Sequence, residues 1–195
     1  MRQILDAESL AVKQIPVTDG YADAIDLIVD RVYRGGGKLV TSGMGKCGQI
    51  ADNIATTFSS TGIPAVFLHP SEAQHGDLGV LQRGDVLLLL SNSGRTSEIV
   101  ALVSLAHNLY ANLPIIVITG NTESPLAAVA DVCLHTGGAP EVCPLGLTPT
   151  TSTTTMTVIG DVLVVGVMNI TGFSRQDYAL RHHGGYLGRK SRDLQ

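Results

Sequence analysis

The stretch 85-DVLLLLSNSGRTSEIV-100 decides the fold, because it passes from a strand to a helix through a run of small polar residues. Residues 85–91 are almost continuously apolar, which is typical of a strand buried on both faces of a sheet. A helical pattern of apolar residues begins at about residue 96. This order predicts one strand–turn–helix unit of a parallel sheet.

The same unit recurs along the chain. Short apolar runs predict strands at 38–42, 65–69, 85–91, 114–120 and 131–137. Helical stretches are expected between most of them, at 46–60, 96–111, 124–129 and 150–171. Parallel strands joined by crossover helices predict an α/β fold: a three-layer αβα sandwich around a flavodoxin-like sheet of about five strands.

The two ends of the chain differ from this core. Residues 1–34 predict two helices interrupted by Pro16 and Gly20, and the glycines at 35–37 end the second helix. The α/β core is expected at 35–171, and the polar, glycine-rich segment 172–195 is expected to form an arm. All 195 residues are therefore expected to form a single domain.

The composition disfavours several functions. Aromatic residues make up 4% of the chain and the net charge is −4, which argues against a nucleic-acid partner. Cys47, Cys133 and Cys143 show no CxxC spacing, so neither a disulfide framework nor a metal site is expected. The N-terminus does not fit a signal peptide and no run of about 18 uncharged apolar residues spans a membrane. We expect a cytoplasmic protein.

The turn 91-SNSGRT-96 has the chemistry of a phosphate site. It lies at the carboxyl end of a predicted strand, where open parallel sheets bind ligands, and it leads into a helix N-terminus. Free backbone N–H groups and the helix dipole favour an anion there, and the small hydroxyls add donors. By itself, such a turn is more often only a capped helix start. No GxxxxGK[ST] motif occurs, so nucleoside triphosphate hydrolysis is not indicated.

A second turn of this kind, 41-TSGMGKCG-48, follows the first predicted strand. It contributes Ser42 and Lys46, although Lys46 is equally compatible with a solvated residue in a first helical turn. No acidic residue follows at a position where it could bind a ribose hydroxyl. The motif is therefore not interpreted as a dinucleotide-binding fingerprint. Two such turns on neighbouring strands favour one shared sugar-phosphate pocket.

In its longer motifs the sequence resembles the SIS (sugar isomerase) domain family, and most closely the D-arabinose 5-phosphate isomerases. The resemblance runs from about residue 35 to residue 190 and includes 69-HPSEAQHGDLG-79, 143-CPLGLTPTTSTT-154 and 183-HGGYLGRK-190. Many relatives continue into a pair of CBS domains. This chain ends at Gln195, so we expect a catalytic domain without CBS domains.

The resemblance implies interconversion of D-ribulose 5-phosphate and D-arabinose 5-phosphate through an enediol, feeding the biosynthesis of Kdo for lipopolysaccharide or capsule. It implies no cofactor, and a homotetramer built from dimers. The implied catalytic residues are Lys46, Glu98, Glu141 and His182. The implied substrate-binding residues are Ser42, Gly45, His75, Ser91, Asn92, Ser93, Gly94 and Thr96.

Each implied catalytic residue has a chemical role that suits this reaction. Glu98 is the first choice of general base, expected one turn into its helix, and His182 suits ring opening or proton transfer at oxygen. Lys46 would stabilise the enediolate, and Glu141 is a second acid/base or an orienting group. Which carboxylate takes the carbon-bound proton stays open. Because His182 lies in the expected arm, we expect the arm to deliver it to a neighbouring subunit's pocket.

Two positions differ from the family pattern, which often has Glu at Arg95 and Pro at His183. The extra positive charge of Arg95 and the missing CBS domains suggest inhibition by a nucleotide sugar. His69 is interpreted as a satisfied core histidine.

The alternative functions are another SIS isomerase acting on a hexulose 6-phosphate, or a non-catalytic sensor of a phosphosugar or nucleotide sugar. A sensor would need only the phosphate-binding turn, so the four ionisable residues favour an enzyme.

Overall fold

A computed structural model describes residues 1–192 and contains one five-stranded parallel sheet with the strand order β2-β1-β3-β4-β5. The strands are β1 (Leu39–Gly43), β2 (Ala65–Phe67), β3 (Val86–Leu90), β4 (Ile115–Thr119) and β5 (Val132–His135). This is the flavodoxin-like order, in which the direction of winding changes between β1 and β3. The predicted fold class and strand positions are confirmed.

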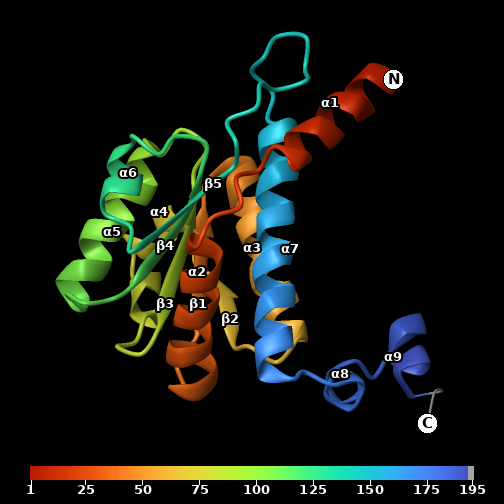
Figure 1. The fold of residues 1–195 in the computed structure, drawn as a ribbon. Coiled ribbons are helices and arrows are strands. Elements are labelled where there is room, and N and C mark those ends of the chain that lie inside the picture. The colour runs from red at the N-terminus through yellow and green to blue at the C-terminus, as the bar shows by residue number, and fades with distance from the viewer. Residues whose placement is uncertain (193–195) are drawn as a thin grey trace.

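Helices cover both faces of the sheet (Figure 1). The first layer holds α2 (Gly20–Ile28), the π-helix η1 (Val29–Arg34), α3 (Gly45–Ser60) and α7 (Thr151–Thr171). The second layer holds α4 (Pro70–Ala73), α5 (Ser97–Leu109) and α6 (Pro125–Ala128). The remaining helices are α1 (Arg2–Lys13), the 3-10 helix η2 (Asp77–Val80), α8 (Arg175–Arg181) and α9 (Gly185–Arg192).

The central strands are apolar throughout because each of their faces packs against a helical layer. In β3, Val86, Leu88 and Leu90 belong to the core on the α3 and α7 side of the sheet. Leu87 and Leu89 point the other way and pack with α5. All five residues of β3 are fully buried, which explains why its sequence shows no alternation of polar and apolar residues.

α7 has the length and hydropathy of a membrane-spanning helix, with a mean hydropathy of 1.5 over its most apolar window. In the structure it is a core helix of the sandwich: Met156, Ile159 and Leu163 are fully buried against the sheet and its neighbouring helices. Length and composition alone therefore do not identify α7 as a membrane span.

The C-terminal arm is more ordered than the sequence suggested. It folds into α8 and α9 beyond the end of α7, on the side of the molecule away from α1 (Figure 1). α8 begins with a capping box in which Ser174 and Asp177 satisfy each other's backbone N–H groups. Both helices are short and separated by glycines, so their periodicity was too weak to predict. Residues 193–195 of the expected arm lie outside the described residues.

Candidate active site

The site lies at the carboxyl ends of β1 and β3, the two strands between which the winding changes. Gly43 and Leu90, the last residues of these strands, are paired in the sheet. α3 starts from β1 toward one face and α5 starts from β3 toward the other. The two polar turns predicted from the sequence therefore lie at the switch point of the sheet, the place where open α/β sheets bind ligands, which we call the crevice.

The 91–96 turn is closed by its own hydroxyl groups. Ser91 Oγ lies 2.9 Å from Thr96 Oγ1 and accepts a hydrogen bond of 3.1 Å from the backbone N–H of Gly94. Ser93 Oγ accepts a bond of 3.2 Å from the N–H of Arg95. Gly94 has a φ of 62°, which glycine adopts without strain. The sequence of small residues thus folds the backbone into a tight loop around the start of α5.

The loop after β4 and the first turn of α6 hold this turn in place. The carbonyl of Asn92 accepts a bond of 3.1 Å from the N–H of Gly120, and the carbonyl of Gly94 accepts one of 3.3 Å from the N–H of Leu126. A Cβ atom added to Gly94 would overlap the side chain of Ser124. The 91–96 turn is therefore fixed in position by the neighbouring strand end.

Glu98 lies in the first turn of α5, not one turn into it as the sequence had indicated, because α5 begins at Ser97. Thr96 is the N-cap residue, and its side chain makes no capping bond. Its own backbone N–H and the hydroxyl of Ser97, which donates to Glu98 Oε2 at 2.8 Å, lower the pKa of the Glu98 carboxyl. Glu98 therefore lies beside the donors at the start of α5 that would bind an incoming phosphate.

The β1–α3 turn supplies the second side of the crevice. Gly45 has a φ of 57° and allows the chain to enter α3, where Lys46 is exposed and donates to Gln49 Oε1 at 3.2 Å. Ser42 is fully buried, and its hydroxyl donates to the carbonyl of Leu68 at 2.6 Å. Ser42 therefore joins β1 to the segment after β2, and its predicted contact with substrate stays a prediction.

Glu141 reaches the same edge of the sheet from the loop between β5 and α7. Its Oε2 atom accepts bonds from the N–H and hydroxyl of Thr150, at 2.7 and 2.9 Å, and from the N–H of Ser152 at 3.3 Å. Partial burial raises the pKa of Glu141, but these hydrogen bonds outweigh it and lower the pKa overall. Glu141 is close enough to Cys47, in the first turn of α3, to affect the pKa of its thiol.

His69 and His75 lie on the connection that follows β2. His69 is half-buried, and its Nδ1 atom accepts a bond of 3.3 Å from the N–H of Ser71 at the start of α4. It also lines a cavity of about 340 Å³ together with Gly43, Gly45, Gly48, Gln49, Asp52 and Phe67. The ring is hydrogen-bonded as expected, but His69 lies at the edge of the sheet and not in the core. Its place just beyond the carboxyl end of β2 is the sequence signal that indicates this edge. His75 is exposed in the turn after α4.

His182 lies at the other end of the molecule. The preceding residue, Arg181, contacts Gly62 just beyond the C-terminal end of α3, whereas Lys46 is at the start of that helix. α3 has 16 residues, which corresponds to a length of about 24 Å. The His182 ring stacks on Tyr178 with a centroid distance of 3.6 Å. One chain therefore brings Lys46, Glu98 and Glu141 to the same edge but leaves His182 distant from it.

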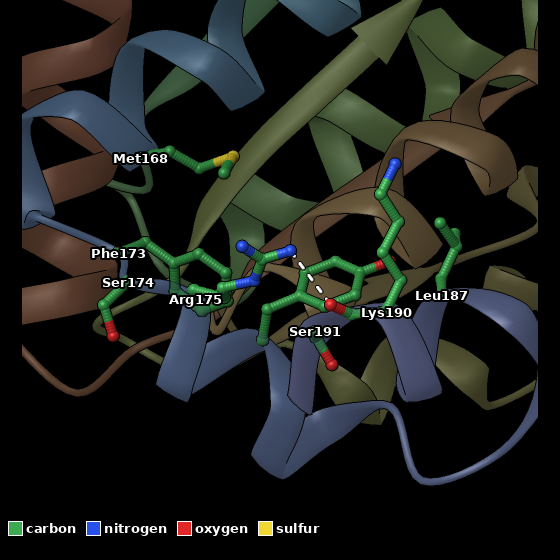
Figure 2. A pocket seen from close by; sticks show the side chains of 8 residues that line it. Met168, Phe173, Ser174, Arg175, Leu187, Lys190 and Ser191 are labelled. Carbon is green, nitrogen blue, oxygen red and sulfur yellow. Dashed lines mark hydrogen bonds between the residues drawn. The ribbon is translucent and has the colours of Figure 1, made fainter. Parts of the chain in front are cut away.

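Figure 2 shows a further cavity, of about 310 Å³, between the end of α7 and the arm. The guanidinium group of Arg175 donates to the carbonyl of Lys190 at 2.9 Å and so joins α8 to α9. The cavity is lined by Met168, Phe173, Ser174, Arg175, Tyr178, Leu187, Lys190 and Ser191. None of the predicted active-site residues lines it, so it is separate from the crevice between β1 and β3.

The model of the SIS domain matches residues 33–166, which contain both polar turns and Glu141. This chain belongs to the SIS domain family. Within the residues that the structure describes, no group of three or more His, Cys, Asp or Glu side chains is placed to hold a metal ion.

Several relatives of this SIS domain are phosphosugar enzymes by name. Arabinose 5-phosphate isomerase KdsD of Shigella flexneri is 49% identical over 164 residues, which are 84% of this chain and 49% of the relative. The SIS domain described here thus spans about half the length of the curated relatives it matches.

Two solved structures match over nearly their whole length. A Bacteroides fragilis protein, described as a candidate phosphosugar isomerase involved in capsule formation, is 66% identical, with a TM-score of 0.94 and coverage of 95% of this chain and 96% of that one. An E. coli protein in complex with arabinose 5-phosphate is 34% identical, with a TM-score of 0.85 and coverage of 93% of this chain and 94% of that one.

Proposed function

We propose that this SIS domain is an aldose–ketose isomerase that interconverts D-ribulose 5-phosphate and D-arabinose 5-phosphate through an enediol. The names of its relatives support this substrate pair: the curated homologues are arabinose 5-phosphate isomerases, and one structural relative is in complex with arabinose 5-phosphate. Both polar turns and the four candidate catalytic residues are present in this chain.

The observation that carries the proposal is the grouping of an anion-binding turn with three ionisable side chains at one sheet edge. The hydroxyls and N–H groups of residues 91–97 suit a terminal phosphate. Lys46 lies in the first turn of α3, which follows the end of β1, and β1 pairs with β3. Glu98 lies in the first turn of α5, which follows the phosphate turn. A pentose phosphate held at the turn would extend its reacting carbons toward these side chains.

The reaction follows from the chemistry of these groups. A carboxylate, Glu98 by preference, removes a proton from C1 of the ketose while O2 is protonated, which gives the enediol. Loss of the O1 proton and return of a proton to C2 then give the aldose. The ammonium group of Lys46 stabilises negative charge on the enediolate oxygens. Glu98 must leave its bond to Ser97 Oγ to do this, and a bound phosphate would compete for that hydroxyl. Glu141, held by the start of α7, orients the substrate or acts as a second acid/base.

His182 would reach this site only from another subunit. Its position, beyond the far end of α3 from Lys46, supports a cross-subunit contribution. We therefore propose a homotetramer, a dimer of dimers, in which the arm of one subunit completes the pocket of its neighbour. We also propose that the enzyme is cytoplasmic and that its product enters the biosynthesis of Kdo for lipopolysaccharide or capsule. A nucleotide sugar bound beside Arg95 would inhibit it.

A coupled assay tests the proposal. Purified protein is given ribulose 5-phosphate or a hexulose 6-phosphate, each with and without a chelator, and the Glu98→Gln variant is the matched control. We expect arabinose 5-phosphate to form from ribulose 5-phosphate at the same rate with chelator, and the variant to lose the activity. Preference for the hexulose 6-phosphate, or binding without turnover of either sugar, would contradict the proposed reaction.

A further inference from the structure

We infer that His135 is a positioning residue, which keeps the 91–96 turn in the shape that binds phosphate by holding the end of the neighbouring strand. This inference deepens the proposed function and rests on it for its link to turnover. His135 is the last residue of β5, is half-buried, and pairs with Thr119, the last residue of β4. It therefore lies at the same edge of the sheet as the 91–96 turn, with β4 between them.

The His135 ring donates a hydrogen bond to the backbone just after β4. Its Nε2 atom lies 3.2 Å from the carbonyl oxygen of Gly120. A carbonyl oxygen can only accept, so Nε2 carries the proton and is the donor. Gly138 lies beside this bond, because a Cβ atom added to it would be 3.6 Å from both the Gly120 oxygen and His135 Nε2. The bond therefore holds the peptide that joins Gly120 to Asn121.

The two residues joined by this peptide contact the phosphate turn at two points. Gly120 donates its N–H to the carbonyl of Asn92 at 3.1 Å, and the side-chain amide of Asn121 donates to the carbonyl of Ser93 at 3.3 Å. A Cβ atom added to Gly120 would overlap the side chain of Asn92, so these two residues pack directly against each other. A shift of the peptide held by His135 is therefore transmitted to residues 92 and 93.

The same contacts set the direction of a donor in the turn. In a trans peptide the C=O and the following N–H point in opposite directions, and no cis peptide bond occurs within residues 1–192. Because the Asn92 carbonyl points toward Gly120, the N–H of Ser93 points away from the β4–α6 loop. This N–H is a donor for the substrate phosphate. Loss of the His135 bond leaves the turn less firmly held and weakens phosphate binding.

His107 makes the same kind of bond at the opposite end of the sheet. It is half-buried like His135, and its Nε2 atom lies 3.3 Å from the carbonyl oxygen of Leu113, which precedes β4. Replacing either histidine removes a ring and a bond to a backbone carbonyl next to β4. The His135 bond leads to the phosphate turn, whereas the His107 bond lies at the start of the strand. Comparing the two separates positioning of the turn from a general loss of stability.

Three variants test the inference. His135→Leu removes the donor, His135→Gln restores an N–H near the place of Nε2, and His107→Leu is the matched control. We expect His135→Leu to weaken binding of inorganic phosphate, measured by calorimetry, and to raise KM for ribulose 5-phosphate, each about three- to tenfold. Its kcat should stay within about twofold of the unsubstituted protein, because phosphate is bound equally in the substrate and the transition state. His135→Gln should recover most of the affinity, and His107→Leu should change neither quantity.

Hydrogen–deuterium exchange of the peptide containing residues 90–96 is a second readout that does not depend on turnover. It should quicken in His135→Leu and stay near normal in His135→Gln and His107→Leu. The inference would be overturned by unchanged phosphate affinity and exchange in His135→Leu, by equal losses in His107→Leu, or by a glutamine variant no better than the leucine variant. An unsubstituted protein that binds no phosphate would also overturn it. Phosphate binding without conversion of ribulose 5-phosphate would refute the proposed reaction alone, because affinity and exchange still decide the role of His135.

Discussion

Glu141 and Thr150 close the loop between β5 and α7: Glu141 Oε2 accepts bonds from both the backbone N–H and the hydroxyl of Thr150, at 2.7 and 2.9 Å. A third bond comes from the N–H of Ser152. The carboxylate thus caps the positive end of the longest helix, and the same carboxylate is a candidate acid/base of the proposed reaction. Stability and catalysis therefore depend on one side chain and can be separated by substitution.

Replacing Glu141 with alanine should lower both stability and activity. The loss of a helix cap predicts a decrease of about 1 kcal/mol in the free energy of unfolding, measured by chemical denaturation. Glu141→Gln keeps an oxygen acceptor, so it should recover most of this stability while turnover remains low. A glutamine variant with normal kcat would restrict Glu141 to a structural role.

The stability supplied by Glu141 should also depend on pH. Its pKa is lowered in the folded protein, so its contribution is present above the pKa of the unfolded chain and is lost as the pH falls through the folded pKa. The advantage of the unsubstituted protein over Glu141→Gln, which does not titrate, should therefore shrink below about pH 4. A difference that is constant from neutral to acidic pH would show that the charge of Glu141 does not stabilise the cap.

Gly94→Ala should disable the phosphate turn. The left-handed conformation of Gly94 costs alanine about 1–2 kcal/mol, and the added Cβ also overlaps Ser124. Phosphate affinity should fall at least tenfold by calorimetry, because the penalty and the overlap together shift the turn. Gly146→Ala is the matched control, since Gly146 has a φ of 63° but no atom within 4 Å of an added Cβ. Equal phosphate affinity in the two variants would contradict a role for the shape of the turn.

Glu98→Gln should separate binding from chemistry. We expect kcat to fall by a factor of about 10²–10⁴, the usual contribution of a general base. Affinity for inorganic phosphate should stay the same or increase, because the variant removes a negative charge beside the donors at the start of α5. Glu123→Gln, at an exposed carboxylate in the β4–α6 loop, is the control. A large loss of phosphate affinity in Glu98→Gln would show that Glu98 takes part in phosphate binding, and would contradict its assignment as a base separate from the phosphate site.

Mixed oligomers test the contribution of His182 across subunits. Glu98→Ala and His182→Ala should each be inactive alone. When the two variants are unfolded, mixed and refolded together, some pockets combine an intact Glu98 with a neighbour's intact His182, and about a quarter of the activity should return by random pairing. The control is each variant refolded alone. Failure of an efficiently mixed sample to regain activity would place both residues in a single chain's pocket or exclude one of them.

Much of the fold was predictable because its signals are local. The buried strands, the two polar turns and α7 each follow from a continuous stretch of sequence, and the observed bounds differ by only a few residues. The location of the crevice also followed, since carboxyl ends of parallel strands share one edge. The arm helices were missed because α8 and α9 have 7 and 8 residues, too few for a clear period.

The features of the site that the sequence did not predict have a common cause: they depend on contacts between distant segments. The capping role of Glu141 requires Thr150, nine residues away across a loop, and the Ser42 hydroxyl is taken by the carbonyl of Leu68. His69 lines a cavity only because β2 ends beside β1. Such pairings depend on tertiary packing, which no local pattern encodes. Glu98 lies in the first turn of α5 rather than one turn into it, although the helix start expected at residue 96 differs from the observed start by only one residue.

A crystal structure of the Glu98→Gln variant with arabinose 5-phosphate tests the central claim most directly, because the variant would hold the sugar without converting it. We predict the phosphate against the hydroxyl and N–H groups of residues 91–97. The C1 and C2 atoms should lie within reach of residue 98 and Lys46, with His182 contributed by a neighbouring subunit. A phosphate bound elsewhere, with the 91–96 turn unoccupied at full ligand saturation, would contradict the account.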